Sequence, residues 1–357
     1  MTRASNLRMG WGMLAAVAAA GLIAAPMAAR AADEPQISKS ERELRSSYDK
    51  DIKGKTIAWV PIALGAPITD IWTAVMQEEA EARGMKFLLR DPNWDATAEL
   101  QAVSALISEK PDILVVHNPS LTLLAKELKR AEEAGIHVIQ MNMESNYLSD
   151  GFVGADWGQI GRMMGEETIK ACGSGTKTSH KVQIVQGELT AAGNVNTVAG
   201  LMQALDKDKE IKVVSSQAAN WDPKKALDIT ATVIQQHPDL CASIGIWGVM
   251  ETGASQAIKN AGKLEQVKII TNGEGSAFDC QQLKEGMYTK YLSYHSDRQA
   301  HDVIDEASVL LQGKMKPGTV HVALYTVPEW LDKASADKPG ACFELPNLKK
   351  PETAAKQ

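Results

Sequence analysis

The sequence predicts an α/β protein of two similar lobes, each built on a parallel β-sheet flanked by helices. Apolar, strand-like runs alternate with amphipathic helical segments across short loops, as in parallel sheets. Residues 111–142 and 238–272 also share a pattern: both begin with Pro-Asp, carry Ala-Gly at a helix end and stop at Asn. Their Pro, Asp, Ala and Gly recur 127 residues apart. A unit repeated at that distance favours two lobes over one sheet.

The composition is that of an ordinary globular protein. The chain has 357 residues, of which 44% are hydrophobic and 23% charged. This length suffices for about two domains.

The first 31 residues have the pattern of a signal peptide. Arg3 and Arg8 precede an apolar run over residues 9–26, and Ala29-Arg30-Ala31 offers a small-x-small cleavage site. A membrane anchor is the alternative, but the run is short for a spanning helix and no Cys follows it for lipid attachment. We expect cleavage near Ala31 and release into a periplasm or outside the cell. Cleavage removes three Arg and shifts the net charge from −6 to −9, which disfavours nucleic acid or an anionic membrane as a partner.

The four cysteines carry no metal-binding motif, because their spacing is too wide for a zinc cluster. In an exported chain they can oxidise. Cys172 and Cys241 could meet at one edge of a sheet, but the pairing of Cys172, Cys241, Cys280 and Cys342 stays open, and unpaired buried thiols are an equal alternative.

Residues 32–54 are expected to form a lead-in segment or surface helix, and the fold to begin at Lys55. The first lobe then reads as strand, helix, strand, helix, the first copy of the repeat, and a fifth strand, at residues 55–64, 66–84, 85–91, 97–110, 111–142 and 151–155. Gly84 is a predicted helix C-cap.

The second lobe repeats this order. A helix from about Asp156 to Cys172 leads to a polar loop, 173–180, that we expect to separate the main bodies of the lobes. Strands and helices follow at residues 181–187, 194–206, 211–217, 223–236 and 238–272, and the chain closes with a strand, a helix and a strand at 287–295, 296–313 and 319–331. The segment from Lys333 onward is predicted to be a loop or frayed terminus.

Ligands of open parallel sheets bind at the carboxyl ends of the strands, so residues there are the candidates. They are Asp70, Trp94, Asn118, Asn142, Glu144, Asp156, Trp157, Asn194, Trp221, Asp222, Trp247 and Glu274. Tryptophan rings beside carboxamides and carboxylates suit a small polyhydroxylated ligand, and equally a small cation. The alternative for the Asp and Asn residues is a role in helix caps and turns.

The sequence carries no phosphate loop, HExxH, GxSxG or CxxC motif, so we predict no catalytic residue, no metal site, no cofactor and no enzyme. Gly273-Glu274-Gly275 matches only the start of a dinucleotide fingerprint, since Phe278 stands at the third glycine. His117 and His295 fall near strand ends and are interpreted as structural rather than ligand-binding.

From about Lys55 to Leu331 the chain resembles the periplasmic sugar-binding proteins of ABC importers, the ribose-binding-like type I group. The resemblance rests on "EARG", "AELQAVSALISEKPDILVV", "AGIHVIQMN", "VGADWGQIGRMMGE", "HPDLCASIGIW", "TGASQAIKNAGK" and "VKIITNGE". It implies two Rossmann-like lobes joined by a three-strand hinge, with crossings near 155–157, 294–296 and 323–326. The first lobe would then hold residues 55–155 and 295–322 and the second 156–294 and 323–345, before a polar tail, 346–357.

The resemblance places ligand contacts at Ile68, Thr69, Asn118, Asn142, Met143, Trp157, Val195, Trp221, Trp247, Gly273 and Tyr294. Asn118 and Trp221 suit the family pattern. Asn142 and Gly273 stand where Asp is usual, Met143 and Val195 where Arg is usual, and Trp247 where Asn is usual. The charged pairs that grip sugar hydroxyls are therefore missing. A polyol, a modified sugar or another small organic ligand fits as well as a standard aldose.

The resemblance implies a monomer that closes around a small sugar or polyol and delivers it to a membrane permease. A sensor subunit for a chemotaxis or signalling receptor, or a binder of a small cationic or aromatic ligand, is the alternative. A cytoplasmic repressor is disfavoured, because the leader occupies the place of a DNA-binding segment and the charge is acidic.

Overall fold

The computed structural model describes residues 37–343 of the 357. The predicted signal peptide and the polar tail lie outside these residues. The chain divides into a leading part up to Leu44 and a compact unit from Arg45 onward, with helix α1 (Lys39–Ile52) spanning the division.

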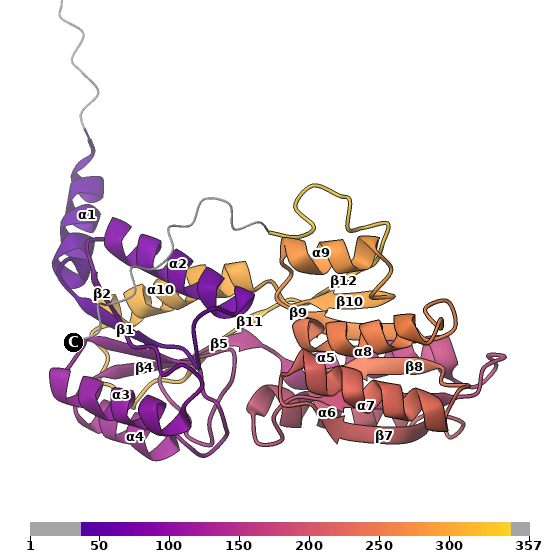
Figure 1. Ribbon diagram of the computed structural model, residues 1–357. Coiled ribbons are helices and arrows are strands. Elements are labelled where there is room, and N and C mark those ends of the chain that lie inside the picture. The colour runs from indigo at the N-terminus through magenta and orange to yellow at the C-terminus, as the bar shows by residue number, and fades with distance from the viewer. Residues whose placement is uncertain (1–36, 344–357) are drawn as a thin grey trace, which may run out of the picture. The chain divides into compact units, whose positions relative to one another are not determined.

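The compact unit contains two six-stranded sheets, and most of their strands are labelled in Figure 1. The first sheet has the order β11-β5-β4-β3-β1-β2, and all its strands are parallel. Its strands are β1 (Thr56–Val60), β2 (Lys86–Leu89), β3 (Ile113–Val116), β4 (His137–Met141), β5 (Gly151–Ala155) and β11 (Val322–Thr326). Every residue of β3 and β4 is buried, as expected for central strands covered on both faces.

The second sheet has the order β12-β10-β9-β8-β6-β7. Its strands are β6 (Lys181–Gln186), β7 (Lys212–Ala218), β8 (Ala242–Gly245), β9 (Lys268–Gly273), β10 (Lys290–Ser293) and β12 (Glu329–Leu331). Only β12 is antiparallel to its neighbour, β10. The two parallel α/β lobes predicted from the sequence are confirmed.

The helices connect successive strands and cover the sheets. They are α2 (Pro67–Ala82), α3 (Ala96–Glu109), α4 (Ala125–Glu133), α5 (Trp157–Cys172), α6 (Ala192–Leu205), α7 (Pro223–Gln236), α8 (Gly248–Asn260), α9 (Ala277–Lys284) and α10 (Ser296–Gly313). Although α10 comes late in the chain, it packs against α2 of the first lobe (Figure 1), where Trp72 Nε1 donates to the Ser296 carbonyl at 3.0 Å. The sequence interpretation missed α9, which is short and is started by a capping box of Ser276 and Asp279.

The last predicted strand, 319–331, is wrong as a single element. It divides into β11, which pairs with β5 in the first sheet, and β12, which pairs with β10 in the second. Val327 and Pro328 lie between them and carry the third passage between the lobes, a few residues beyond the predicted 323–326. Pro328 has no backbone N–H for a sheet ladder, which suits a break between two strands. The resemblance assigns residues 323–345 to the second lobe. The first four of these residues, 323–326, belong instead to the first sheet.

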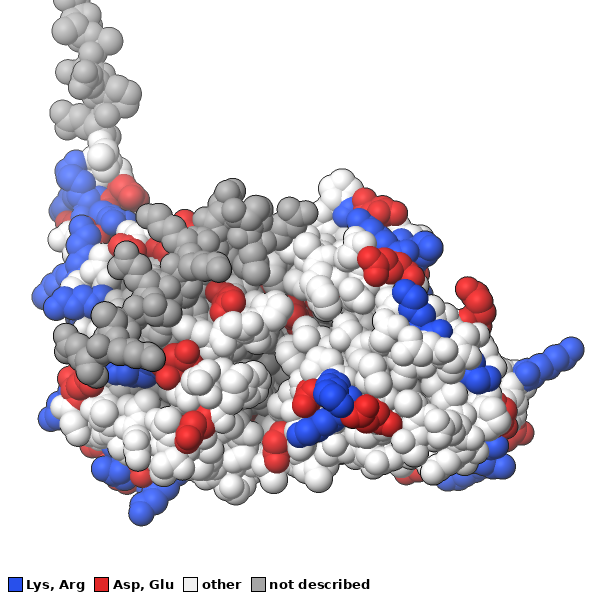
Figure 2. Space-filling view, in the orientation of Figure 1, with Lys and Arg blue, Asp and Glu red and all other residues white. Residues whose placement is uncertain are grey.

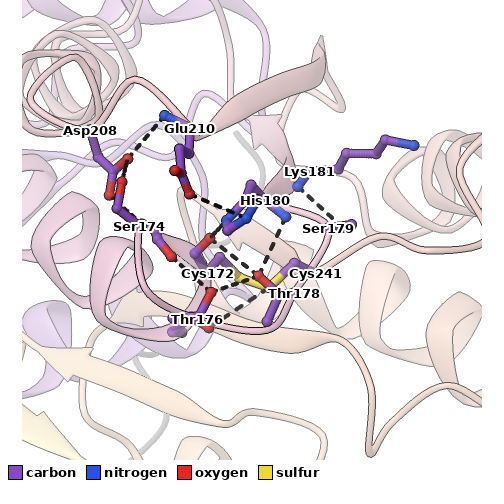
Figure 3. Close-up of polar contacts among 12 residues, drawn as sticks. Cys172, Ser174, Thr176, Thr178, Ser179, His180, Lys181, Asp208, Glu210 and Cys241 are labelled. Carbon is purple, nitrogen blue, oxygen red and sulfur yellow. Dashed lines mark hydrogen bonds and ion pairs between the residues drawn. A yellow bond between two sulfur atoms is a disulfide. The ribbon is translucent and has the colours of Figure 1, made fainter.

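The loop 173–180 was expected to lie between the lobes, but it joins α5 to β6 within the second lobe. Its side chains are tied down by hydrogen bonds, among them Ser174 to Asp208 at 2.7 Å and His180 Nδ1 to the Cys172 carbonyl at 2.7 Å (Figure 3). A Cys172–Cys241 disulfide lies beside it, and a second disulfide joins Cys280 to Cys342. All four cysteines are paired, so the alternative of free thiols is excluded.

On the face shown in Figure 2, acidic and basic side chains are interspersed among uncharged ones. Within residues 37–343, no helix combines the length and apolar character needed to cross a membrane. In the same residues, no group of three or more His, Cys, Asp or Glu side chains is arranged to hold a metal ion.

Candidate ligand site

A cavity of about 70 Å³ lies between the carboxyl ends of the two sheets. Its walls come from both lobes and are mostly aromatic or aliphatic. The lining residues are Ile62, Ala63, Ala66, Ile68, Thr69, Trp94, His117, Asn142, Met143, Trp157, Gly193, Trp221, Ile246, Trp247, Asn272 and Tyr294. Such an apolar pocket with a few polar groups at strand ends is the usual form of a small-molecule site.

Two of the tryptophans are presented by the same turn, once in each lobe. Asn93-Trp94-Asp95 and Asn220-Trp221-Asp222 are identical tripeptides 127 residues apart, the offset of the longer repeat. In both copies the Asn and the Trp have positive φ, between 52° and 65°. In both copies the Asp caps the following helix by accepting from two backbone N–H groups. The left-handed turn aims the ring at the cavity while the cap fixes the turn on α3 or α7.

The ring of Trp221 occupies space left by a glycine. A Cβ atom on Gly187 would lie 2.1 Å from the Trp221 ring, so no larger residue fits there without moving the indole. Trp221 also meets Trp247 edge to face, with ring centroids 6.2 Å apart. These contacts fix the second-lobe wall of the cavity.

Trp157 and Trp247 use their indole N–H groups away from the cavity. Trp157 Nε1 donates to the Asn142 carbonyl at 2.6 Å, and Trp247 Nε1 donates to Glu274 Oε2 at 3.0 Å. Trp157 also packs edge to face on Tyr294 at 5.2 Å. Since their only donors are satisfied, these two indoles offer the cavity carbon surface alone.

Three buried polar side chains in the wall keep unpartnered atoms. Both amide hydrogens of Asn272 are used, toward the Ile246 carbonyl and Met164 Sδ, which leaves Oδ1 as an acceptor without a partner. Asn142 Oδ1 and both ring nitrogens of His117 also lack partners among the described residues. Buried polar atoms are nearly always hydrogen-bonded, so these atoms are available to a ligand or to water.

The wall holds no Asp, Glu, Lys or Arg side chain. Burial lowers the pKa of His117 to about 3, so the imidazole is neutral at physiological pH. Behind Trp247, burial and the neighbouring Asp279 raise the pKa of Glu274, which favours the neutral carboxylic acid. The cavity wall is therefore uncharged and largely aromatic, and a small cation would find no carboxylate in it.

The structure brings seven of the residues predicted to contact the ligand into the cavity wall. These are Thr69, Trp94, Asn142, Trp157, Trp221, Trp247 and Tyr294, and the family positions Ile68 and Met143 join them. Asn118, Asn194 and Glu274 lie behind the wall: Asn118 donates to Gln140 and to the Met143 carbonyl, and Asn194 accepts from the Gly187 N–H. They hold cavity residues in place.

Three other predicted residues lie away from the cavity. Asp70 accepts from the Gly65 N–H at the start of α2, and Asp156 caps α5. Glu144, hydrogen-bonded by Asn196, lines a separate cavity of about 610 Å³ together with Asp156. The family positions Val195 and Gly273 are also outside the aromatic cavity, whose wall contains Gly193 and Asn272 instead.

Asn272 and His117 line the cavity but were not among the predicted ligand contacts, and His117 was interpreted as structural. Asn272 ends the second copy of the repeat as Asn142 ends the first, so the repeat itself held the signal. The doubled Asn-Trp-Asp tripeptide was a second signal, since an identical turn in both lobes marks equivalent positions around the cleft.

A two-lobed α/β fold with a mostly apolar cavity between the strand ends is typical of a solute-binding protein. A family model described as "Periplasmic binding protein domain" matches residues 57–315, well over half of the chain. The chain belongs to this family, which confirms the resemblance, and the family is one of binding proteins rather than enzymes.

Two curated relatives and one solved structure illustrate the similarity. The D-ribose/D-allose-binding protein of Pseudomonas aeruginosa is 28% identical over 247 residues, 66% of this chain and 76% of the relative. The ribose import binding protein of Salmonella typhimurium is 24% identical over 266 residues, 72% of this chain and 86% of the relative. An ABC transporter periplasmic solute-binding protein of Actinobacillus succinogenes, solved with bound D-allose, superimposes with a TM-score of 0.70 at 21% identity over 79% of this chain and 99% of its own. At that identity the superposition shows a shared fold.

Proposed function

We propose that this chain is the substrate-binding subunit of an ABC importer, which captures one small sugar or polyol between its lobes and delivers it to a membrane permease. The observation that carries the proposal is the aromatic cavity, whose walls come from both lobes at the carboxyl ends of the strands. A ligand that touches Trp94 and Asn142 on one side and Trp221, Trp247 and Asn272 on the other favours the closed form over the open one.

The relatives support a sugar-like ligand, because those named above bind ribose or allose. Aromatic rings stack on the C–H faces of such molecules, and carboxamide oxygens accept from their hydroxyls. We assign ligand contact to the seven predicted residues in the cavity wall and to His117 and Asn272.

Export is part of the proposal. Two disulfides within the described residues form readily only in an oxidising compartment such as the periplasm. Together with the leader pattern, they support cleavage near Ala31 and a periplasmic location.

The test is a titration of the purified mature protein with neutral sugars and polyols, followed by tryptophan fluorescence and melting temperature. Four indoles line the cavity, so a bound solute should change the emission and raise the melting temperature. Absence of both responses to every compound in the panel would contradict the proposed function.

A further inference from the structure

We propose that direct contacts between the two lobes form a clasp, which holds the cleft closed and slows the release of the ligand. The clasp consists of two hydrogen bonds between the lobes, Asn196 to Glu144 and Leu121 to Thr190. Its role in ligand release rests on the proposed function, whereas the clasp itself is tested without any ligand.

The first bond of the clasp joins two side chains. Asn196 lies on α6 of the second lobe, and its Nδ2 donates to Oε1 of Glu144, which follows β4 of the first lobe, at 2.5 Å. Both residues are half-buried. Because the donor and the acceptor belong to different lobes, this bond breaks when the lobes separate.

The second bond of the clasp joins two backbone groups. The Leu121 N–H, in the loop after β3, donates at 2.9 Å to the carbonyl of Thr190, in the loop after β6. The Leu121 carbonyl accepts from the Asn146 N–H at 2.7 Å, which is a contact within the first lobe. The Leu121 amide therefore depends on contact between the lobes, and the Asn146 amide does not.

An apolar cluster supports the two bonds. Ile62 and Met143 of the first lobe pack with Ala191 and Ala192 of the second, and Leu121 packs against this cluster. Burial of apolar surface between the lobes favours the closed arrangement. The clasp lies outside the three segments that connect the lobes, 155–157, 294–296 and 327–328. Its contacts are therefore made only while the cleft is closed.

Contacts that exist only in the closed form affect release more than capture. A ligand held between both lobes leaves when the lobes separate, so the clasp lowers the population of the open form and slows opening. Loss of one such hydrogen bond changes an equilibrium constant by about tenfold. The dissociation rate constant should therefore rise when the clasp is removed, while the association rate constant stays nearly unchanged.

Amide hydrogen exchange of the unliganded mature protein, resolved by residue with NMR, tests the clasp. We expect the Leu121 amide to be protected in the wild type and to exchange about tenfold faster in Glu144→Ala and in Asn196→Ala. Asn196→Ala changes only the second lobe, so in this variant the Asn146 amide should exchange at the wild-type rate.

Three further variants separate loss of the bond from general damage. In the double variant Glu144→Ala/Asn196→Ala, Leu121 should exchange no faster than in either single variant, because both remove the same bond. Glu144→Gln keeps an oxygen acceptor and should keep the wild-type protection. Glu265→Ala removes an exposed carboxylate between α8 and β9 and should exchange as the wild type does.

An unprotected Leu121 amide in the wild type, or a wild-type exchange rate in both alanine variants, would overturn the clasp. Additive effects in the double variant would overturn the pairing of Glu144 with Asn196. These results do not depend on ligand binding, so failure of the clasp leaves the proposed function standing.

Stopped-flow tryptophan fluorescence tests the role in release, with whichever of D-ribose, D-allose and xylitol binds the wild type most tightly. The dissociation rate constant should rise about tenfold in Glu144→Ala and Asn196→Ala and stay unchanged in Glu144→Gln. An unchanged dissociation rate constant in both alanine variants would contradict this role. No binding by any of the three compounds would contradict the role in release as well, together with the proposed function, and would leave the clasp to the exchange experiment.

Discussion

Gly187 and Trp221 form one steric unit at the edge of the cavity. The ring lies where a side chain at position 187 would be, and it closes the second-lobe wall against Trp247. In Gly187→Ala we expect the indole to be displaced and the affinity for the ligand to fall at least tenfold, with a loss of stability of about 1–3 kcal/mol from overpacking. Calorimetric titration and urea unfolding measure the two effects.

A double variant separates steric displacement from general damage. In a Trp221→Ala background the space beside position 187 is empty, so Gly187→Ala should cost little additional stability. An equal cost in both backgrounds would show that the two residues are not coupled and would contradict the steric explanation.

Glu99 is a buried carboxyl that should affect how the stability of the protein depends on pH. It is 1% exposed, its Oε1 lacks a partner, and burial raises its pKa to about 9. The folded protein thus holds a proton that the unfolded chain releases above a pH of about 4.5, so this residue makes stability fall as pH rises from about 4.5 toward 9. Glu99→Gln should lose that contribution, which changes by about 4 kcal/mol between pH 5 and pH 8 for a carboxyl whose pKa is raised from 4.5 to about 9.

Urea unfolding of both proteins at pH 5 and pH 8 checks this prediction. The other buried carboxyls, such as Glu251 and Glu306, are unchanged in the variant, so only the difference between the two proteins is informative. The same fall in stability for wild type and Glu99→Gln would contradict the assignment.

At the scale of elements, the contact between α5 and α6 positions the part of the cavity wall that Trp157 and Gly193 form at the starts of these helices. A Cβ atom on Gly161 would lie 2.0 Å from the Thr197 carbonyl oxygen, and one on Gly200 would lie 2.1 Å from that of Gly158. Gly161→Ala should separate the helices, cost about 2–3 kcal/mol and weaken binding, because Gly193 at the start of α6 lines the cavity.

Gly158→Ala on the same helix is the matched control. Its Cβ would meet only side-chain atoms, the flexible end of Arg162 at 3.3 Å and Asp156 Oδ1 at 3.6 Å. Replacing a helical glycine with alanine stabilises by up to about 1 kcal/mol where space permits. Equal melting temperatures for the Gly158 and Gly161 variants would contradict the close-packing explanation.

The two disulfides also join separate elements of the fold. Cys172–Cys241 links the end of α5 to the residue before β8, and Cys280–Cys342 links α9 to the segment after β12. They close loops of similar length, with sequence separations of 69 and 62 residues. Replacing either pair by serines should therefore lower the free energy of unfolding by a similar amount, about 2–4 kcal/mol. Urea unfolding of the two double variants gives the values, and no loss in either one would contradict a stabilising role.

At the scale of the whole molecule, features with a local pattern could be predicted and non-local ones could not. The order of strands and helices, and the tryptophans at strand ends, follow from local periodicity and turn residues. The pairing of β11 with β5 depends on which of the two sheets an apolar segment joins, and this is not encoded locally. Within the predicted strand 319–331, only Pro328 indicated that the segment divides into two strands. Capping side chains such as Asp156 and cavity side chains such as Trp157 are neighbours in the sequence, so position alone could not separate them.

The choice between Asn272 and Glu274 shows the same limit. Both stand at the end of β9, yet Asn272 lines the cavity while Glu274 lies behind Trp247 and binds its indole N–H. A sequence pattern places both residues at the correct edge of the sheet. Only the packing of the tryptophan decides which one reaches the ligand.

The central claim is that one small solute is bound by both lobes at once. Calorimetric titration of wild type, Trp94→Ala and Trp247→Ala with the tightest ligand of the sugar and polyol panel tests it most directly, because these residues represent opposite walls of the same cavity. Trp94 is 57% exposed, so its loss should leave the melting temperature of the unliganded protein nearly unchanged. We predict a single binding site in the wild type and a loss of affinity of at least tenfold in each variant. Wild-type affinity in either variant would contradict a site shared between the lobes.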